Sequence, residues 1–283
     1  MTKTERGIPY KPPVTIIEPK KGWIPIDFRE LAQYRELLFF LTWRDILIRY
    51  KQTALGVLWA VIQPLVSMVI FSVVFGRFGK LPSEGVPYPV FSFTALLPWN
   101  LFASALTRAT ASVVGSSNMV KKIYFPRMLI PISSTLSPLV DFAISLAVLF
   151  GLMAYYRMPF GWGLWLLPLL MLITLFVALG VGFWLAALNV KYRDVGHAIP
   201  FLVQAWMYAS PVAYAISLIP PRWLPLYSLN PMVVVINGFR WAILGTALLP
   251  RNTILLSLAT GLVILVSGAF YFRRMEKTFS DVV

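Results

Sequence analysis

Few side chains in this sequence are of the types that perform catalysis or bind metals. The 283 residues include no cysteine and a single histidine, His197, which excludes disulfides, thiolate sites and histidine clusters for a metal. Asp141 is the only acidic residue deep within an apolar run. One carboxylate supplies neither an acid–base pair nor a relay of acids for proton coupling. The sequence also lacks a phosphate-binding glycine loop and the G-x-S-x-G and H-E-x-x-H patterns. It therefore disfavours a membrane enzyme and a proton-driven transporter.

Arg108 and Asp141 are the two charged residues that fall inside apolar runs. A charge in hydrocarbon is costly, and it is typical of an ion pair or of a transport pathway. The two residues differ in expected depth by about six positions, or about 9 Å at the rise of a helix, and a flexible arginine spans much of that distance. Three interpretations stay open: a structural pair, contact with a substrate, and separate snorkelling of each side chain.

Polar and aromatic side chains recur at intervals of three or four residues along two of the apolar runs. Because a four-residue step turns a helix only about 40° from its starting direction, such residues share one stripe. Aromatic rings and amides on one stripe suit the flat faces and hydroxyls of sugars, whereas helix packing through hydrogen bonds is the alternative. The candidate residues of a substrate channel are Trp59, Gln63, Ser67 and Phe71 in the first run and Phe201, Gln204 and Tyr208 in the second.

Residues 118–127, NMVKKIYFPR, form a short segment that mixes basic and apolar side chains between two long apolar runs. Exposed aromatic residues on such a loop are typical of a segment that binds in the groove of a partner protein. The alternative is contact with the membrane surface, with lysines at the lipid headgroups and aromatic rings in the interface.

The elements that must position these residues are membrane-spanning helices. Apolar residues make up 58% of the chain and charged residues 13%, so that lipid is the solvent for most of it. A helix needs about 20 mostly apolar residues to span a bilayer. Six segments meet this requirement: 55–76, 90–114, 129–155, 164–188, 196–217 and 253–272.

The distribution of Lys and Arg predicts the orientation of these spans. With six spans, 18 basic residues fall in the two termini and in the loops on their side, and six fall in the loops on the other side. This places both termini in the cytoplasm and explains the net charge of +14 without a nucleic-acid partner. The first 54 residues are too rich in charge and proline for a secretory leader.

Two segments have helical patterns but are not expected to span the membrane. Residues 27–54 contain an amphipathic helix, which we expect at the membrane interface or packed on a partner. Pro220, Pro221 and Pro225 interrupt the chain at the start of residues 218–252. Asn230, Pro231 and Gly245 then predict a helix over 231–244 through an N-cap, a first-turn proline and a C-cap. This helix is too short to cross, which indicates a re-entrant segment; an outer loop with one surface helix is the alternative.

These observations divide the chain into four parts: a cytoplasmic tail (1–26), an amphipathic interface or gate helix (27–54), a transmembrane domain of six helices (55–272) and a second cytoplasmic tail (273–283). The fold class is therefore an all-α integral membrane protein.

Five stretches resemble, in the right order, the ABC-2-type permeases that export bacterial cell-surface polysaccharides such as O-antigen, teichoic acid and capsular polymers. Together they cover about residues 30–275, and the first 25 residues contain no family motif. The stretches are RDILIRYKQTALGVLWAVIQPL (44–65), LLPWNLF (96–102), VKKIYFPR (120–127), NVKYRDV (189–195) and SLNPM (228–232).

The resemblance implies a fold and a set of partners. The fold would be that of an ABC-2, or type V, exporter, with re-entrant helices before the last span. The chain would form a homodimer in the bacterial inner membrane, with a channel between the two copies lined by the first and fifth spans. Two separate ATP-binding subunits would hold ATP and Mg, and this chain would hold no cofactor. The substrate would be a polysaccharide on a lipid carrier, commonly undecaprenyl diphosphate.

The resemblance also assigns roles to residues. The segment that couples the permease to the ATPase would consist of Lys121, Lys122, Ile123, Tyr124, Phe125, Pro126 and Arg127. The amphipathic helix, 29–51, would contribute to the same interface and to a gate on the lipid side. On the basis of charge, Arg44, Arg49 and Lys51 are candidates to bind the phosphates of the lipid carrier.

Three other functions compete with polysaccharide export. The same fold class exports small lipids or drugs, which a narrow aliphatic channel would favour. A glycosyl or acyl transferase is disfavoured by the lack of paired acids, cysteine or a second histidine. A structural scaffold is disfavoured by the broken helices in 218–252.

The expected topology is tested by labelling single cysteines, since the chain has none of its own. We expect Lys121→Cys and Lys191→Cys to react with a membrane-impermeant maleimide only after the inner membrane is permeabilised. Arg157→Cys, in a loop expected outside, is the control that reacts in intact spheroplasts. Reaction of either lysine position from the periplasmic side would overturn the six-span topology.

Overall fold

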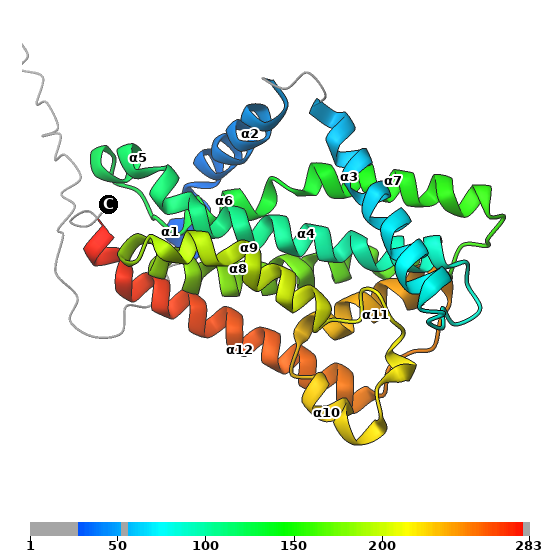
Figure 1. The fold of residues 1–283 in the computed structure, drawn as a ribbon. Coiled ribbons are helices and arrows are strands. Elements are labelled where there is room, and N and C mark those ends of the chain that lie inside the picture. Colours follow the sequence, from blue (N-terminus) through cyan, green and yellow to red (C-terminus); the bar gives the residue numbers. More distant parts are fainter. Residues whose placement is uncertain (1–27, 52–55, 280–283) are drawn as a thin grey trace, which may run out of the picture.

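The computed structural model describes residues 28–51 and 56–279, which form helices and no strands. The long helices run side by side, and α1, α5 and the end of α12 gather at one end of the molecule (Figure 1). We call this the inner end, and the opposite end, with the loops 79–87 and 156–163, the outer end. The α-helices are α1 Phe28–Gln33, α2 Arg35–Lys51, α3 Gly56–Phe71, α4 Tyr88–Gly115, α5 Ser117–Lys122, α6 Leu129–Leu136, α7 Leu139–Tyr155, α8 Leu167–Lys191, α9 Asp194–Tyr208, α10 Leu224–Tyr227, α11 Pro231–Leu244 and α12 Arg251–Met275. A π-helical segment, η1 Ser72–Phe78, and four 3-10 turns, η2 Leu164–Leu166, η3 Ile216–Leu218, η4 Pro221–Trp223 and η5 Glu276–Thr278, complete the described elements.

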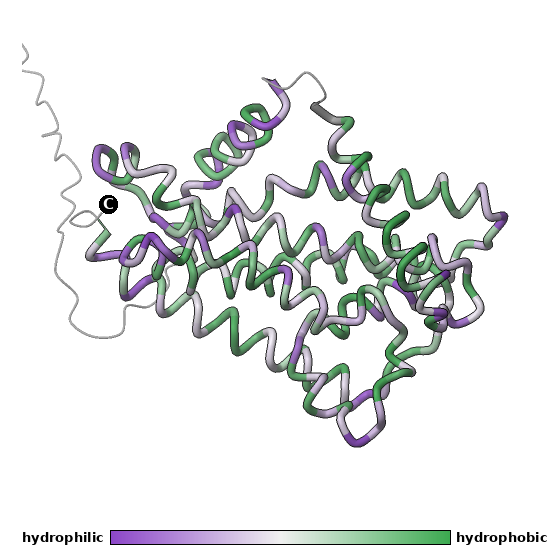
Figure 2. Tube along the Cα trace, viewed as in Figure 1, coloured by the Kyte–Doolittle hydropathy of each residue, from purple (hydrophilic) through white to green (hydrophobic). Residues whose placement is uncertain are grey.

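Five segments are long and apolar enough to cross a membrane, and they correspond to five of the six expected spans. Apolar residues follow these helices along most of their length, whereas hydrophilic residues concentrate at the inner end and in loops (Figure 2). The third expected span has the bounds that the sequence predicted. The segments are Leu58–Phe78, Tyr88–Gly115, Leu129–Tyr155, Leu164–Lys191 and Arg251–Thr278.

The expected span over 196–217 is wrong in its extent. α9 has only 15 residues and ends at Tyr208, which gives about 22 Å of helix where a span needs about 20 residues. The helix ends shortly before Pro211, because the proline ring disfavours the helical conformation for the preceding residue. Hydropathy does not register this end, since residues 209–217 are also mostly apolar.

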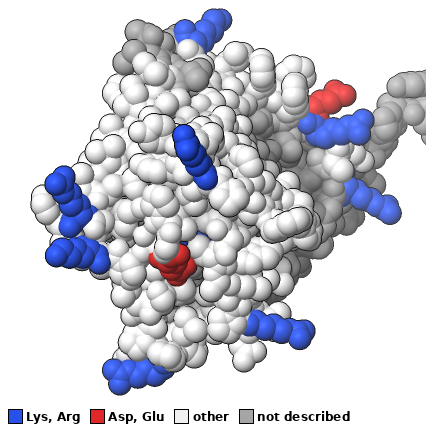
Figure 3. Space-filling model, turned by 90° about the vertical axis from the view of Figure 1, so that its right-hand side faces the viewer, with Lys and Arg blue, Asp and Glu red and all other residues white. Residues whose placement is uncertain are grey.

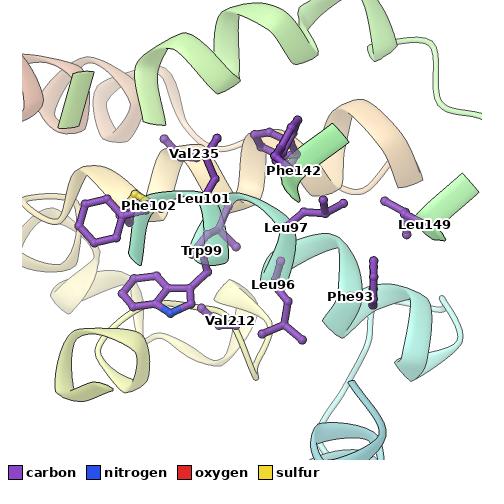
Figure 4. Packing of buried hydrophobic residues seen from close by; sticks show 14 of the residues in the cluster. Phe93, Leu96, Leu97, Trp99, Leu101, Phe102, Phe142, Leu149, Val212 and Val235 are labelled. Carbon is purple, nitrogen blue, oxygen red and sulfur yellow. The ribbon is translucent and has the colours of Figure 1, made fainter. Parts of the chain in front are cut away.

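α4 lies at the centre of the molecule and is the most buried of the five long segments. It contacts α3, α6, α7, α8, α9 and α11. Figure 4 shows Leu97 and Leu101 of α4 among Phe142 of α7, Val235 of α11 and Val212 of the segment after α9. The core therefore joins helices from both halves of the chain, and α4 sets the position of every element around it.

α11 is the helix that the sequence predicted over 231–244, and its bounds are confirmed. The Asn230 side chain accepts a hydrogen bond from the backbone N–H of Met232 at 3.0 Å, as an N-cap does. Gly245 ends the helix with φ 70°, in the left-handed region that glycine adopts without strain. Most side chains of α11 are buried against α4, α8 and α12, so it is an internal helix and not one on an exposed loop.

The amphipathic segment forms two helices, α1 and α2, separated at Tyr34. α2 contacts α6 on one side. Phe39, Phe40 and Ile48 on its other sides are each about two-thirds exposed, which is typical of a helix that borders lipid or a partner. The expected tail 1–26 and the linker residues 52–55 lie outside the described residues, as do residues 280–283 of the second tail.

α8 and α12 approach each other at glycines. A Cβ atom added at Gly268 would lie 2.1 Å from the carbonyl oxygen of Gly180, which is backbone and cannot rotate away. On another face of α8, a Cβ at Gly182 would lie 2.8 Å from Cβ of Ala109 on α4. Small residues thus let the backbones of α4, α8 and α12 come into direct contact.

We expect Gly268→Ala to destabilise the protein by about 1–3 kcal/mol, because the added methyl group forces α8 and α12 apart. Gly151→Ala is the matched control, since Gly151 also lies in a helix but has open space where a Cβ would be. The control should be neutral or stabilise by up to about 1 kcal/mol through its helix propensity. Thermal unfolding of the purified proteins in detergent measures both effects. Equal stability of the two variants would contradict the close contact.

Candidate functional site

A partly polar cavity of about 420 Å³ lies between α3, α4 and α7, with the end of α2 at its edge. Its polar side chains come from all four helices, although most of the surrounding sequence is apolar. A polar cavity inside an apolar domain is typical of a binding site or pathway. The polar residues that line it are Arg49, Gln63, Asn100, Ser104, Thr107, Arg108, Asp141 and Ser145, together with Trp59.

α4 supplies one wall of this cavity. Asn100, Ser104, Thr107 and Arg108 follow each other at intervals that place them on one side of the helix. The Thr107 hydroxyl donates to the carbonyl of Ala103 at 2.8 Å, so it is satisfied within its own helix. This side of α4 is therefore polar, while the remaining sides carry the apolar core.

Asp141 binds to α2 and not to α4. Its carboxylate forms an ion pair with the guanidinium of Arg49 at 2.8 Å and accepts a hydrogen bond from the Tyr50 hydroxyl. Arg108 lines the same cavity, but the ion-pair partner of Asp141 among the described residues is Arg49. The reason is tertiary: α2 folds back so that its last turn lies over the first turn of α7.

The environment of Tyr50 keeps its hydroxyl protonated. Burial, together with the hydrogen bond to Asp141 and the charge of that carboxylate, raises the pKa of Tyr50 to about 12. The hydroxyl therefore remains a donor at neutral pH. Two donors from α2 thus hold the one carboxylate at the mouth of the cavity.

The stripe of candidate channel residues on α3 divides between the cavity and the core. Trp59 and Gln63 line the cavity, and Ser67 is half-buried. Phe71 is buried and packs edge-to-face on Phe75, with ring centroids 5.3 Å apart. Three four-residue steps turn the helix by about 120° in total, so Phe71 faces the core of the chain, and its expected place in a channel stays a prediction.

The stripe on α9 lies elsewhere. Phe201, Gln204 and Tyr208 are exposed, and the Gln204 amide donates to the Tyr208 hydroxyl at 3.1 Å. None of the three lines the cavity beside α3. Within one chain, the structure therefore does not bring the two stripes together.

The three candidates for phosphate binding also separate. Arg44 and Lys51 border an apolar groove on the exposed side of α2, with Phe40, Trp43, Leu47 and Ile48. Arg44 forms an ion pair with Asp45 at 2.9 Å. Arg49, in contrast, points toward Asp141 and the cavity. One cation of the three lies in the cavity, and two lie at the outer surface of the amphipathic helix.

Residues 120–127, which we call the docking loop, divide into exposed and buried side chains. Tyr124 is 79% exposed and Ile123 is 59% exposed, and the side chains of Lys121 and Lys122 are also exposed. Phe125 is 4% exposed and packs in the inner-end core, and Pro126 is buried beside it. Residues 121–124 of the loop are therefore accessible, and Phe125 fixes the loop to the rest of the protein.

A polar cluster that the sequence did not lead us to expect lies near the outer end. Arg240 of α11 is 1% exposed, donates to the carbonyls of Val212 at 2.9 Å and Tyr214 at 3.1 Å, and lies 3.6 Å from the ring centroid of Phe91. By sequence, Arg240 is one of the six basic residues on the outer side of the spans. An arginine in the middle of an apolar helix is the signal that could have identified it.

Asn230 extends this cluster to α9. Its side chain accepts from the indole N–H of Trp206 at 3.0 Å and donates to the Ser210 hydroxyl at 2.9 Å. The end of α9 and the start of α11 are thereby joined by hydrogen bonds.

On the face at the outer end, shown in Figure 3, basic side chains are scattered and acidic side chains are sparse, so this end has no large charged patch.

Comparisons with known proteins identify related sequences along most of the chain. The family model described as "ABC-2 type transporter" matches residues 36–244. A protein named "O-antigen export system permease protein RfbA" from Myxococcus xanthus is 34% identical over 256 residues, which cover 88% of this chain and 96% of that protein. A protein of the same name from Klebsiella pneumoniae is 27% identical over 88% of this chain and 95% of its own length. The "Polysialic acid transport protein KpsM" of Escherichia coli is 23% identical over 71% of this chain and 78% of its own length.

The ion pair at the cavity mouth gives an asymmetric prediction. Asp141→Asn should destabilise the protein more than Arg49→Gln, because it leaves Arg49 and Arg108 at one cavity without their carboxylate. The double variant should be more stable than the sum of the single effects predicts, with a coupling of about 1–2 kcal/mol. Thermal unfolding of the four proteins in detergent measures this cycle. Additive effects would show that the pair contributes nothing.

Proposed function

The chain belongs to the ABC-2 type transporter family, and we propose that it is the membrane subunit of an ATP-driven exporter of a lipid-linked cell-surface polysaccharide. The observation that carries this proposal is the similarity to O-antigen export permeases over nearly the whole length of both proteins. The polysialic acid transport protein, a relative with another polysaccharide in its name, supports the same class of substrate.

We propose that the chain crosses the bacterial inner membrane six times, with both termini in the cytoplasm. Five crossings are the long apolar segments. The sixth crossing has two parts, α9 and the segment that follows it and leads to α11. Together these two parts reach the outer end. The excess of Lys and Arg on the side of the termini supports this orientation. α11 then acts as a re-entrant helix that is shielded from lipid by α4, α8 and α12.

The working unit is a homodimer with its channel between two copies. Within one chain the stripes on α3 and α9 are separate, and both leave large apolar side chains exposed, among them Trp59 and Phe201. A second copy placed against these faces brings four stripes around one path. Aromatic rings, Gln63 and Gln204 then give a sugar chain stacking surfaces and hydrogen bonds along that path, and Ser67 and Tyr208 add hydroxyls.

The phosphates of the lipid carrier bind near the inner end. Arg49 and Arg108 are two cations on one cavity that has a single carboxylate, Asp141, so the site retains a net positive charge for an anionic group. Arg44 and Lys51 border the exposed apolar groove of α2, where they would meet the headgroups of surrounding lipids. An arriving diphosphate would compete with Asp141 for Arg49, which links binding of the carrier to the position of α2.

Two ATP-binding subunits supply the energy and bind ATP and Mg²⁺ themselves. They contact the docking loop through Ile123 and Tyr124, and they also contact α2. ATP-driven closure of the pair would shift both elements and move the polymer in steps. No nucleic acid takes part, and membrane lipids surround the exposed apolar faces.

A charge on the docking loop tests the assembly and the function together. We expect Tyr124→Asp to abolish copurification with the ATP-binding subunit and to reduce surface polysaccharide at least about tenfold in a strain that depends on this exporter, since an aspartate in an apolar contact costs more than the 1.4 kcal/mol that a factor of ten requires. Tyr155→Asp is the matched control, because Tyr155 is 80% exposed at the outer end. It should retain assembly and export.

Two outcomes would contradict the proposal. Retained assembly in Tyr124→Asp would place the ATPase interface elsewhere. Normal ATPase assembly of the unaltered chain with export of a small lipid or drug, and of no polysaccharide, would favour the alternative substrate class.

A further inference from the structure

We infer that Glu276 is a positioning residue that fixes the docking loop to the C-terminal end of α12. The inference rests on the proposed docking of an ATP-binding subunit at residues 120–127. It concerns a residue beyond the part of the chain that the family model matches, which ends at residue 244.

The contacts of Glu276 join two segments that are about 150 residues apart in the sequence. One carboxylate oxygen, Oε1, accepts from the backbone N–H of Arg127 at 2.9 Å. The other, Oε2, forms an ion pair with Nη1 of Arg273 at 2.6 Å. The Arg127 guanidinium in turn donates to the backbone carbonyl of Glu276. The loop and the turn η5 therefore hold each other by both side chains and by both backbones.

The contact lies in a sheltered position at the inner end. The Glu276 side chain is 13% exposed. Phe279 follows it and is fully buried against Phe272 of α12, with ring centroids 5.2 Å apart. Phe125 of the docking loop is buried in the same cluster. Apolar packing thus fixes the turn on one side, and charge-assisted hydrogen bonds, which are among the stronger contacts in proteins, fix the loop to the turn.

The same cluster reaches the amphipathic segment. Arg273 also lies 3.7 Å from the Glu30 carboxylate on α1. A cavity of about 230 Å³ opens between the docking loop, α1 and the turn, and exposed Tyr124 borders it. The surface that meets the ATPase is therefore supported from behind by α12 and α1, and Glu276 lies at the point where the three meet.

This arrangement predicts a specific fault when it is lost. A docking loop that has lost its contacts with Glu276 still exposes Ile123 and Tyr124 and still binds the ATPase. It changes its own conformation, however, when the ATPase moves. ATP hydrolysis then continues while less of the movement reaches the membrane helices. A residue that contributed only to stability would not change the amount of polymer exported per ATP.

Two variants separate the contacts of Glu276. Glu276→Ala removes both carboxylate contacts. Glu276→Gln retains an oxygen for the Arg127 N–H and loses the charge that pairs with Arg273. Asp194→Asn is the matched control. Asp194 is an exposed carboxylate at the same end of the molecule, and its substitution removes the same charge as Glu276→Gln does.

The experiment uses the full-length chain assembled with its ATP-binding subunit in lipid. We expect Glu276→Ala to raise hydrogen exchange at the Arg127 amide about tenfold or more, the effect of losing one charge-assisted hydrogen bond. Polymer exported per ATP should fall about fivefold or more, the lower end of typical coupling effects. Glu276→Gln should be intermediate, and the amount of bound ATPase should match that of Asp194→Asn.

Unchanged exchange at Arg127, or control-level export per ATP in Glu276→Ala, would overturn the inference. If the Glu276→Ala chain does not assemble with the ATP-binding subunit, Glu276→Gln and Arg273→Gln test the inference in its place. Arg273→Gln removes the cationic partner of the ion pair. Control-level values in both would equally overturn it. If the unaltered complex exports no polysaccharide, the proposed function fails, whereas hydrogen exchange at Arg127 still tests the contact itself.

Discussion

A charge that lies at membrane depth must be neutralised by the protein itself, because hydrocarbon offers neither water nor counterions. Two charged residues of this structure, one lining the cavity and one fully buried, are stabilised by contacts of different kinds. Asp141 receives a guanidinium and a hydroxyl from the last turn of α2. Arg240 receives two backbone carbonyls and the face of an aromatic ring. Each contact also fixes the position of a segment that hydropathy alone does not place relative to its neighbours. The contact of Asp141 fixes α2 over α7. The contact of Arg240 fixes residues 212–214 against α4 and α11. The position of the polar cavity follows from the first contact.

Features that depend on neighbours in the sequence could be predicted from the sequence. The bounds of α11 are encoded by Asn230 and Pro231 at one end and by Gly245 at the other, and all three act on the backbone next to them. Most spans could be placed because an uninterrupted apolar run of sufficient length has few alternatives in a membrane protein. Trp59, Gln63, Arg108 and Asp141, which the sequence singled out by residue type and position, all line the cavity of the single chain.

Features that depend on distant partners could not be predicted. The partner of Asp141 comes from 92 positions earlier, and relative depth in the membrane does not reveal which helix folds back. Phe125 and Tyr124 are adjacent aromatic residues, yet one is buried and the other exposed, because only the first meets the core formed by α8 and α12. The early end of α9 was hidden by the apolar residues that follow it. The burial of Arg240 could not be predicted either, because its acceptors, the carbonyls of Val212 and Tyr214, lie in a different segment.

The junction between α9 and α11 differs from the contact between α8 and α12. It is held by hydrogen bonds from Asn230 to Trp206 and Ser210, whereas α8 and α12 are held by close backbone packing. Water can replace the partners of a hydrogen bond at small net cost, but it cannot replace packed apolar atoms. Separating α9 from α11 at this junction therefore costs less free energy where water reaches the polar groups than where it does not. Access of water to the junction and separation of the two helices are thus thermodynamically linked.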